Sequence, residues 1–234
     1  MFSTTQWTVV FRAAHEKTGA GRPALSTVME KYWQPLYVFA RQQGLSSVDA
    51  EDATQAFLSE LIEGDLLEKA DPAKGRFRTY LLTAWKRFLI DQHRAERAAK
   101  RGGKVIVQSL QTSLAEQHWR SLAIEQAPPD ELYTSSWATG LVDETIRRLK
   151  LEYMNGRIAM FDELLPQLTV PVDQGVYTEI ARKLAITEGA AKVALHRLRQ
   201  RFAKTLREVT AETIEDPAEL NTEIDELIRV LAKK

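Results

Sequence analysis

The stretch of sequence that decides the fold runs from Tyr177 to Arg201 and reads YTEIARKLAITEGAAKVALHRLRQR. Apolar residues recur in it at three- and four-residue steps, which predicts one helix over residues 177–184 and a second that begins at 188. Between them lies the short segment Ala185-Ile186-Thr187. Since Ile186 is apolar and Thr187 can cap the helix that follows it, we expect a tight turn there. The sequence therefore predicts two helices joined by a three-residue turn.

The second of these helices has an apolar face and a basic face. At the helical repeat its apolar stripe consists of Ala191, Leu195, Leu198, Phe202 and Leu206. Such a helix can bury the stripe in its own domain and lay its basic side in the DNA major groove, where side chains read base edges and phosphates. Any amphipathic helical hairpin could show the stripe, but the order of turn, cap and basic helix favours DNA binding. The candidate DNA contacts are Thr187, Glu188, Lys192, His196, Arg197, Arg199 and Arg201.

Charge is distributed unevenly along the chain. The 234 residues include 32 Lys or Arg and 32 Asp or Glu, so the net charge is zero. Residues 72–104 nevertheless include ten basic and two acidic residues, and residues 181–207 include eight basic residues and one acidic residue. Residues 208–226 hold eight acids and no base. Two basic segments suggest two contacts with a polyanion, although charge alone leaves solvated helix faces as an alternative.

Helical periodicity covers most of the remaining chain, and alternating β-branched runs are scarce. This periodicity predicts an all-α fold. Pro35 suits the first turn of a new helix, Gly44 suits a helix C-terminus, and Ser47 is a plausible N-cap. The expected helices ahead of the hairpin cover residues 24–32, 35–44, 47–63, 77–100, 115–123, 142–153 and 158–165.

These expected helices form two domains. Residues 1–103 make the first domain, residues 104–136 a linker, and residues 137–207 the second domain, followed by an acidic extension over residues 208–234. The extension could cover the basic helix and lower its affinity for DNA. Alternatively, its apolar residues could pack as a helix on the second domain.

Catalytic signatures are missing from the sequence. The chain has no Cys, and its four His residues lack metal-ligand spacing. Neither a phosphate-binding G-x-x-x-x-G-K-[ST] motif nor an H-E-x-x-H motif is present. The acids Asp49, Glu51 and Asp52 could mimic a nuclease site, but such acids usually match the dipole of a helix N-terminus. We therefore expect no enzyme activity, metal or cofactor. No stretch is apolar enough to span a membrane, so we expect a cytoplasmic protein.

Three segments together resemble one protein family. The stretch EIARKLAITEGAAKVALHRLRQR is similar to the region 4 helix-turn-helix of bacterial RNA polymerase sigma factors of the extracytoplasmic-function (ECF) group of the sigma-70 family. DAEDATQAFL, residues 49–58, resembles the D-A-E-D-x-x-Q-x-x-F helix of their region 2. FRTYLLTAWKRFLIDQHRAERA, residues 77–98, resembles the helix that follows it. The resemblance implies a factor that binds core polymerase and directs transcription initiation.

The resemblance also implies roles for particular residues. It places Asp49, Asp52, Gln55 and Phe57 against the β′ clamp helices of the polymerase, while the β flap is a second expected contact. The −10 promoter element would be opened and bound by Lys74, Arg76, Arg78, Tyr80, Trp85, Arg87, Arg94 and Arg97. Aromatic rings and a positive groove are what hold single-stranded DNA. The helix-turn-helix would read the −35 element, and an anti-sigma factor or another regulator is a further partner class.

One departure from the family pattern lies in the recognition helix. Where the family usually has G-T-V-K-S-R-L, residues 189–195 read GAAKVAL, so the promoter sequence is left open. Two other functions also stay open at this point. A conventional helix-turn-helix regulator binding duplex DNA would explain residues 177–201 but give residues 49–58 no role, and a helical adaptor would bind only protein. Titration with salt separates the adaptor from both DNA-binding proteins.

Overall fold

The computed structural model describes residues 22–63, 66–67, 71, 75–99, 110–122, 127–214 and 216–232, leaving aside the side chains of residues 22–28, 63, 95–99, 110–112 and 122. Within these ranges all regular structure is helical and no strand is present, which confirms the all-α prediction. The chain divides into two compact units, Met1–Gly140 together with Ala211–Lys234, and Leu141–Thr210. No described helix combines the length and apolar character needed to cross a membrane.

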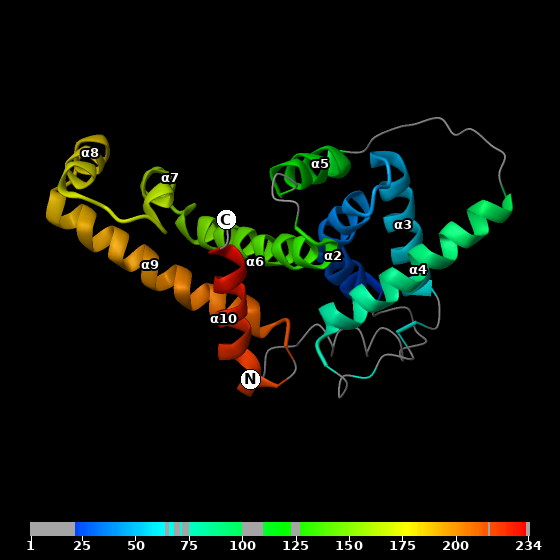
Figure 1. Ribbon diagram of the computed structural model, residues 1–234. Coiled ribbons are helices and arrows are strands. Elements are labelled where there is room, and N and C mark those ends of the chain that lie inside the picture. Colours follow the sequence, from blue (N-terminus) through cyan, green and yellow to red (C-terminus); the bar gives the residue numbers. More distant parts are fainter. Residues whose placement is uncertain are drawn as a thin grey trace. The chain divides into compact units, whose positions relative to one another are not determined.

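The first unit is built around a core of aromatic and aliphatic side chains. Its helices are α2 (Arg22–Gln42), α3 (Ser47–Glu63), α4 (Phe77–Ala99), α5 (Leu110–Leu122), the start of α6 (Pro129–Tyr153) and α10 (Leu220–Leu231). In Figure 1, α2 lies beside α3 and α5, which both contact it. The ring of Phe57 from α3 lies 5.0 Å from that of Trp85 from α4. The Trp85 indole N–H donates to the carbonyl of Leu36 at 3.2 Å, so this buried nitrogen has a hydrogen-bond partner.

Helix α2 is continuous, whereas the sequence predicted two helices separated ahead of Pro35. Pro35 lies inside α2. A proline removes one hydrogen bond from a helix and bends it. The neighbouring Tyr32, Leu36 and Phe39 are buried in the core, and their packing holds the helix together across the proline. Gly44 ends the helix as expected, with a φ of +93° that favours glycine.

Helix α3 is capped one residue earlier than predicted. Ser46, not Ser47, accepts a hydrogen bond from the Asp49 backbone N–H at 3.1 Å, and its hydroxyl donates to the Asp49 carboxylate at 2.7 Å. This is a variant of the capping box, in which the third helical residue is an acid that returns the contact. Counted from Ser46 that residue is Asp49, but counted from Ser47 it is Ala50, which cannot play this part.

Part of the expected linker belongs to the first unit. Helix α5 lies within residues 104–136 and is joined to α2 by Glu116, whose carboxylate accepts from Arg41 Nε at 2.8 Å and from the Tyr37 hydroxyl at 2.7 Å. The Arg41 guanidinium also lies 4.1 Å from the Trp119 ring centroid. The linker prediction was wrong here because α5 docks through one charged cluster and shows little apolar periodicity.

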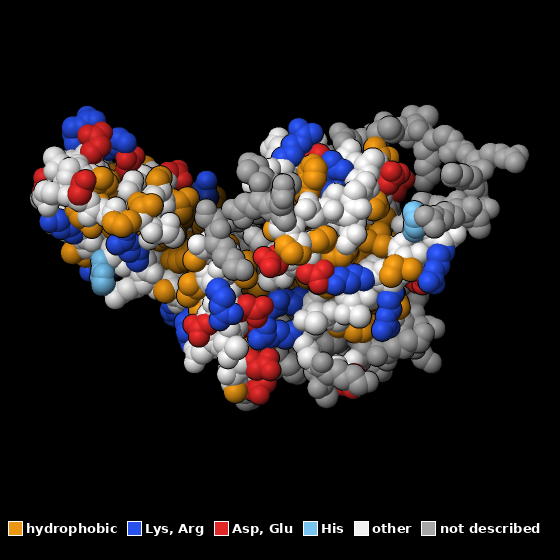
Figure 2. Space-filling model, in the orientation of Figure 1, with side chains coloured by type: hydrophobic (Ala, Val, Ile, Leu, Met, Phe, Trp, Pro, Cys, Tyr) orange, Lys and Arg blue, Asp and Glu red, His pale blue; other side chains and the backbone are white. Residues whose placement is uncertain are grey.

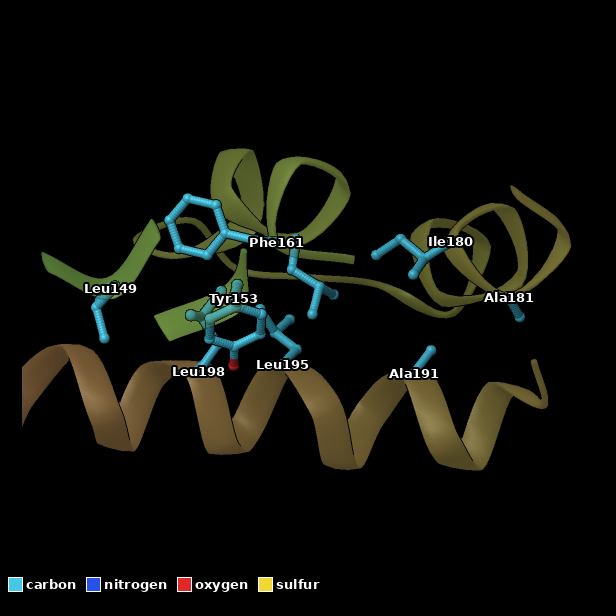
Figure 3. Close-up of a cluster of buried hydrophobic side chains, with 9 residues drawn as sticks. Leu149, Tyr153, Phe161, Ile180, Ala181, Ala191, Leu195 and Leu198 are labelled. Atoms are coloured by element: carbon cyan, nitrogen blue, oxygen red, sulfur yellow. The ribbon is translucent and has the colours of Figure 1, made fainter. Parts of the chain in front are cut away.

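The second unit encloses a separate core. It contains the end of α6, α7 (Ile158–Leu164), the 3₁₀ helix η2 (Leu165–Gln167), α8 (Gln174–Leu184) and most of α9 (Glu188–Ala211). Figure 3 shows Ala191, Leu195 and Leu198 along one side of α9, facing buried residues from the other helices. The apolar stripe predicted for this helix is thus confirmed as buried at its first three positions, while Phe202 and Leu206 are half-buried.

The acidic extension lies elsewhere than predicted. Its helix α10 belongs to the first unit, where Glu223 and Leu227 are each about 1% exposed. The Glu223 carboxylate accepts from Arg78 Nε at 3.0 Å. The expected packing of this helix on the second domain was wrong, because the extension's docking depends on a buried ion pair with a distant arginine, which apolar periodicity does not reveal.

Candidate nucleic-acid interface

The turn between α8 and α9 has the geometry expected from the sequence. Ala185 adopts a left-handed φ of 52°, and the Ile186 N–H donates to the Ala181 carbonyl at 3.0 Å. The Thr187 hydroxyl accepts from the Ala190 N–H at 3.1 Å, which confirms it as the N-cap of α9. The turn residues 185–187 are therefore as predicted, while α8 begins three residues earlier than expected, at Gln174.

The side of α9 opposite the buried stripe is basic and exposed. Lys192, His196, Arg197, Arg201 and Lys204 all lie on the exposed part of this helix. In Figure 2, separate blue Lys and Arg side chains are visible along the region of α9. A helix with one side buried and an exposed basic side has the arrangement that enters a DNA major groove.

The first turn of α9 is tied to α8 by polar contacts. Glu188 accepts from the Thr178 hydroxyl at 2.8 Å and from the side chain of Gln174. Lys192 Nζ donates to the Gln174 side-chain oxygen at 2.9 Å and lies 5.3 Å from the Tyr177 ring centroid. Glu188 and Thr187 thus stabilise the turn. Exposed contacts such as that of Lys192 are weak enough to be exchanged for a phosphate.

Arg199 does not lie on the exposed basic face. It is half-buried and donates to three backbone carbonyls: from Nε to Leu168 at 3.1 Å, and from Nη2 to Gln167 at 2.9 Å and Val170 at 2.7 Å. These carbonyls lie at the end of η2 and just after it, where helix-terminal carbonyls lack helical partners. In the free protein its guanidinium thus holds the segment between α7 and α8, and the predicted DNA contact of Arg199 stays a prediction.

The first unit contains a cavity of about 760 Å³ along one side of α4. Tyr80 and Arg87, both predicted contacts of the −10 element, line it. Burial raises the pKa of Tyr80, while the charge of Arg87 opposes the rise, so the phenol stays protonated near neutral pH. Its hydroxyl donates to the Leu66 carbonyl.

Several polar residues of this cavity were missed by the sequence analysis. Thr79, Thr83 and Gln92 line it beside Tyr80 and Arg87. The signal was present for Thr79 and Thr83, which recur with Tyr80 and Arg87 at the three- and four-residue steps of one helix face, but not for Gln92, which lies five positions after Arg87. The cavity lining presents hydroxyl, amide, aromatic and guanidinium groups, which can bind a nucleobase by hydrogen bonds and stacking.

Two predicted −10 contacts are buried instead. Trp85 is completely buried between Phe57 and Phe88, so its ring offers no face to a base. Arg78 is only 8% exposed and is paired with Glu223. Both predictions were wrong for the same reason: each side chain points into the first unit, and its polar atoms are already satisfied there.

The remaining predicted −10 contacts differ in accessibility. Arg87 and Arg94 are exposed, and Arg94 lies 3.6 Å from Asp91 one turn before it. Arg76 is half-buried and forms ion pairs with α10. Lys74 and the side chain of Arg97 lie outside the described residues.

Helix α3 presents the residues predicted to bind the polymerase, with one exception. Asp49 and Gln55 are exposed, and Asp52 is half-buried. Phe57 is completely buried, in ring contact with Trp85. The prediction that it touches a partner was wrong, because Phe57 shares the apolar face of α3 with the buried Ala53 and Leu61 at four-residue steps.

Comparison with known proteins identifies one family. A model of the ECF sigma factor family matches residues 26–208, which include the helix-turn-helix and the helices that form most of the first unit. Neither the curated proteins nor the solved structures include a match to the chain. On this match, the chain belongs to the ECF sigma factor family, whose members bind core RNA polymerase and promoter DNA to direct transcription initiation.

Proposed function

We propose that the two units divide the work of promoter recognition. The second unit reads the −35 element as duplex DNA, and the first unit binds core polymerase and holds the opened −10 element. The observation that carries this proposal is the basic exposed side of α9 opposite a stripe that is buried at Ala191, Leu195 and Leu198. An exposed recognition helix supported by its own core can enter a major groove without refolding.

In the second unit, we infer a readout that combines phosphate and apolar contacts. Arg197 and Arg201 are exposed and supply positive charge, while Val193 is 49% exposed between them and the helix N-terminus. An apolar side chain in the major groove contacts the methyl group of thymine. Since Val193 and Ala194 replace the Ser and Arg of the usual family pattern, a thymine-containing −35 element fits this helix.

In the first unit, the cavity beside Tyr80 is the proposed place for an unstacked −10 base. Tyr80 supplies an aromatic ring and Arg87 a guanidinium, and both line this cavity. Arg94, which is exposed further along α4, is suited to the phosphate backbone. Stacking combined with positive charge is how proteins hold single-stranded DNA.

The acidic side of α3 is the proposed polymerase contact. Asp49 and Gln55 are exposed there and Asp52 is half-buried, so they can meet a basic protein surface such as the β′ clamp helices. The β flap is the proposed partner of the second unit.

Co-elution with core RNA polymerase on size exclusion, at near-physiological salt, tests the proposal first. We expect a stable one-to-one complex that selects promoter-like duplexes from a randomised pool. A folded protein that binds duplex DNA but does not co-elute with the polymerase would instead act as a conventional regulator. A protein whose DNA affinity does not change with salt would contradict DNA binding by either unit.

A further inference from the structure

The C-terminal helix α10 places a row of carboxylates on the arginines at the start of α4. Glu223 and Glu226 are three residues apart and share one side of α10, and Glu219 is the N-cap residue one turn before Glu223. Arg76 Nη1 lies 2.5 Å from the carboxylates of both Glu223 and Glu226, and its Nε lies 3.8 Å from that of Glu219. In Figure 2, red and blue side chains lie together where α10 meets α4.

The inner part of this ion-pair network anchors the helix. The side chains of Arg78 and Glu223 are 9% and 1% exposed, and the Arg78 guanidinium lies 4.5 Å from the Trp137 ring centroid. Burial by itself would lower the pKa of Arg78, but the charge of Glu223 and its hydrogen bonds raise it overall, so the guanidinium stays charged. Together with the buried Leu227, this pair anchors α10 in the first unit.

The outer part of the network is accessible to water, and it is joined to the inner part by Glu226, whose carboxylate also lies 2.9 Å from Arg78 Nη2. The side chain of Arg76 is 23% exposed, and those of Glu219 and Glu226 are 52% and 31% exposed. The pair of Glu219 with Arg76 is the most exposed of these and adds little to stability. Glu219 and Glu226 also neutralise Arg76, which lines the same cavity as Tyr80 and Arg87.

We propose that α10 is an intramolecular competitor for promoter DNA, whose carboxylates occupy Arg76 until a phosphate replaces them. A carboxylate and a phosphate make the same kind of charge-assisted contact with a guanidinium, so one can be exchanged for the other. The inference rests on the proposed role of α4 in −10 binding. It places the competitor on the first unit, not on the recognition helix α9.

The test compares two substitutions that remove the same charge from the same helix. Glu226→Gln removes one carboxylate from Arg76 and from Arg78 and leaves Glu223 in contact with both, whereas Asp225→Asn alters the neighbouring exposed acid and is the matched control. Binding to a short labelled single-stranded oligonucleotide is measured by fluorescence anisotropy over a range of salt concentrations. We expect Glu226→Gln to tighten binding several-fold and to steepen the salt dependence by about 0.7 for the one freed arginine. Asp225→Asn should change affinity much less.

Further variants separate a failure of the competitor proposal from a failure of the proposed −10 role of α4. Adding Arg76→Ala to Glu226→Gln should abolish the gain. If Arg87→Ala weakens binding but Glu226→Gln and Asp225→Asn behave alike, the competitor is contradicted and the proposed function stands. If Arg87→Ala leaves single-strand affinity unchanged, the −10 role of α4 fails. Thermal melting checks that each variant is folded, and Glu219→Gln, at the more exposed position, replaces Glu226→Gln if that variant does not fold.

Discussion

Arg197 and Arg199 lie two positions apart on α9 and perform different tasks. Arg197 is exposed, whereas Arg199 donates to three carbonyls of the segment that precedes α8. We expect Arg199→Ala to lower the free energy of unfolding by about 1–3 kcal/mol, because partly buried carbonyls lose their donors. Urea denaturation of the two single variants measures this, and equal stability of Arg199→Ala and wild type would contradict it.

Arg197→Ala is the matched substitution for DNA binding. We expect it to leave the free energy of unfolding unchanged and to weaken binding to duplex DNA. If Arg197 contacts one phosphate, the slope of log affinity against log salt should become shallower by about 0.9. Anisotropy titrations at several salt concentrations give this slope, and an unchanged slope would remove Arg197 from the phosphate contacts.

Glu116 makes the first unit sensitive to acid. Hydrogen bonds from Arg41, opposed by burial and supported by Tyr37, lower the pKa of Glu116 from 4.5 to about 2. A lowered pKa stabilises the fold above pH 4.5, and this stabilisation is lost as the pH falls toward 2. After a discount for screening by solvent, we expect Glu116→Gln to lower the free energy of unfolding by about 2 kcal/mol at neutral pH. The loss should become smaller as the pH falls from 4.5 toward 2. Urea denaturation of wild type and variant across this pH range tests the prediction, and a stability difference that does not depend on pH would contradict it.

At the scale of single elements, the N-terminus of α3 depends on one hydroxyl. Ser46 accepts from the Asp49 N–H and donates to its carboxylate. We expect Ser46→Ala to lower the free energy of unfolding by about 1 kcal/mol, the usual effect of losing an N-cap. Ser46→Asp, which keeps an acceptor at that position, is the control. If Ser46→Ala is as stable as wild type, the capping contact does not contribute.

The exposed side of α3 and the exposed side of α9 should serve different partners. We expect Asp52→Arg to impair co-elution with core polymerase, because it places a positive charge on the proposed acidic contact. The double variant Lys192→Ala and Arg197→Ala should co-elute normally and bind duplex DNA weakly. Thermal melting establishes that both proteins are folded. Normal holoenzyme formation by Asp52→Arg would exclude that residue from the polymerase contact.

At the scale of the whole molecule, the two units differ in how far the sequence predicted them. In the second unit, the turn at residues 185–187, the Thr187 cap and the buried stripe were all predicted correctly. These features depend on contacts between residues close in the chain, so periodicity and capping patterns reveal them. The carbonyl contacts of Arg199 were the exception, since these partners are about thirty residues away in sequence.

The first unit was predicted less well because distant segments complete it. Glu116 reaches Arg41 across 75 positions, and Glu223 reaches Arg78 across 145. Both contacts join charged residues that look like solvated surface when each helix is considered alone. An aromatic residue such as Trp85 has the same ambiguity, since its type suits either a core or a base-stacking surface.

The sequence by itself determined the helical class, the family resemblance and the position of the recognition helix, because each is encoded in local spacing of apolar, capping and basic residues. Only the tertiary structure decided which basic side chains remain available to bind DNA. Arg197 is exposed, while Arg78 is buried against Glu223 and Arg199 is bound to carbonyls. The physical reason is that a charge's availability depends on its distant partners, and a guanidinium already held by a carboxylate or carbonyls must lose those contacts before it can bind a phosphate.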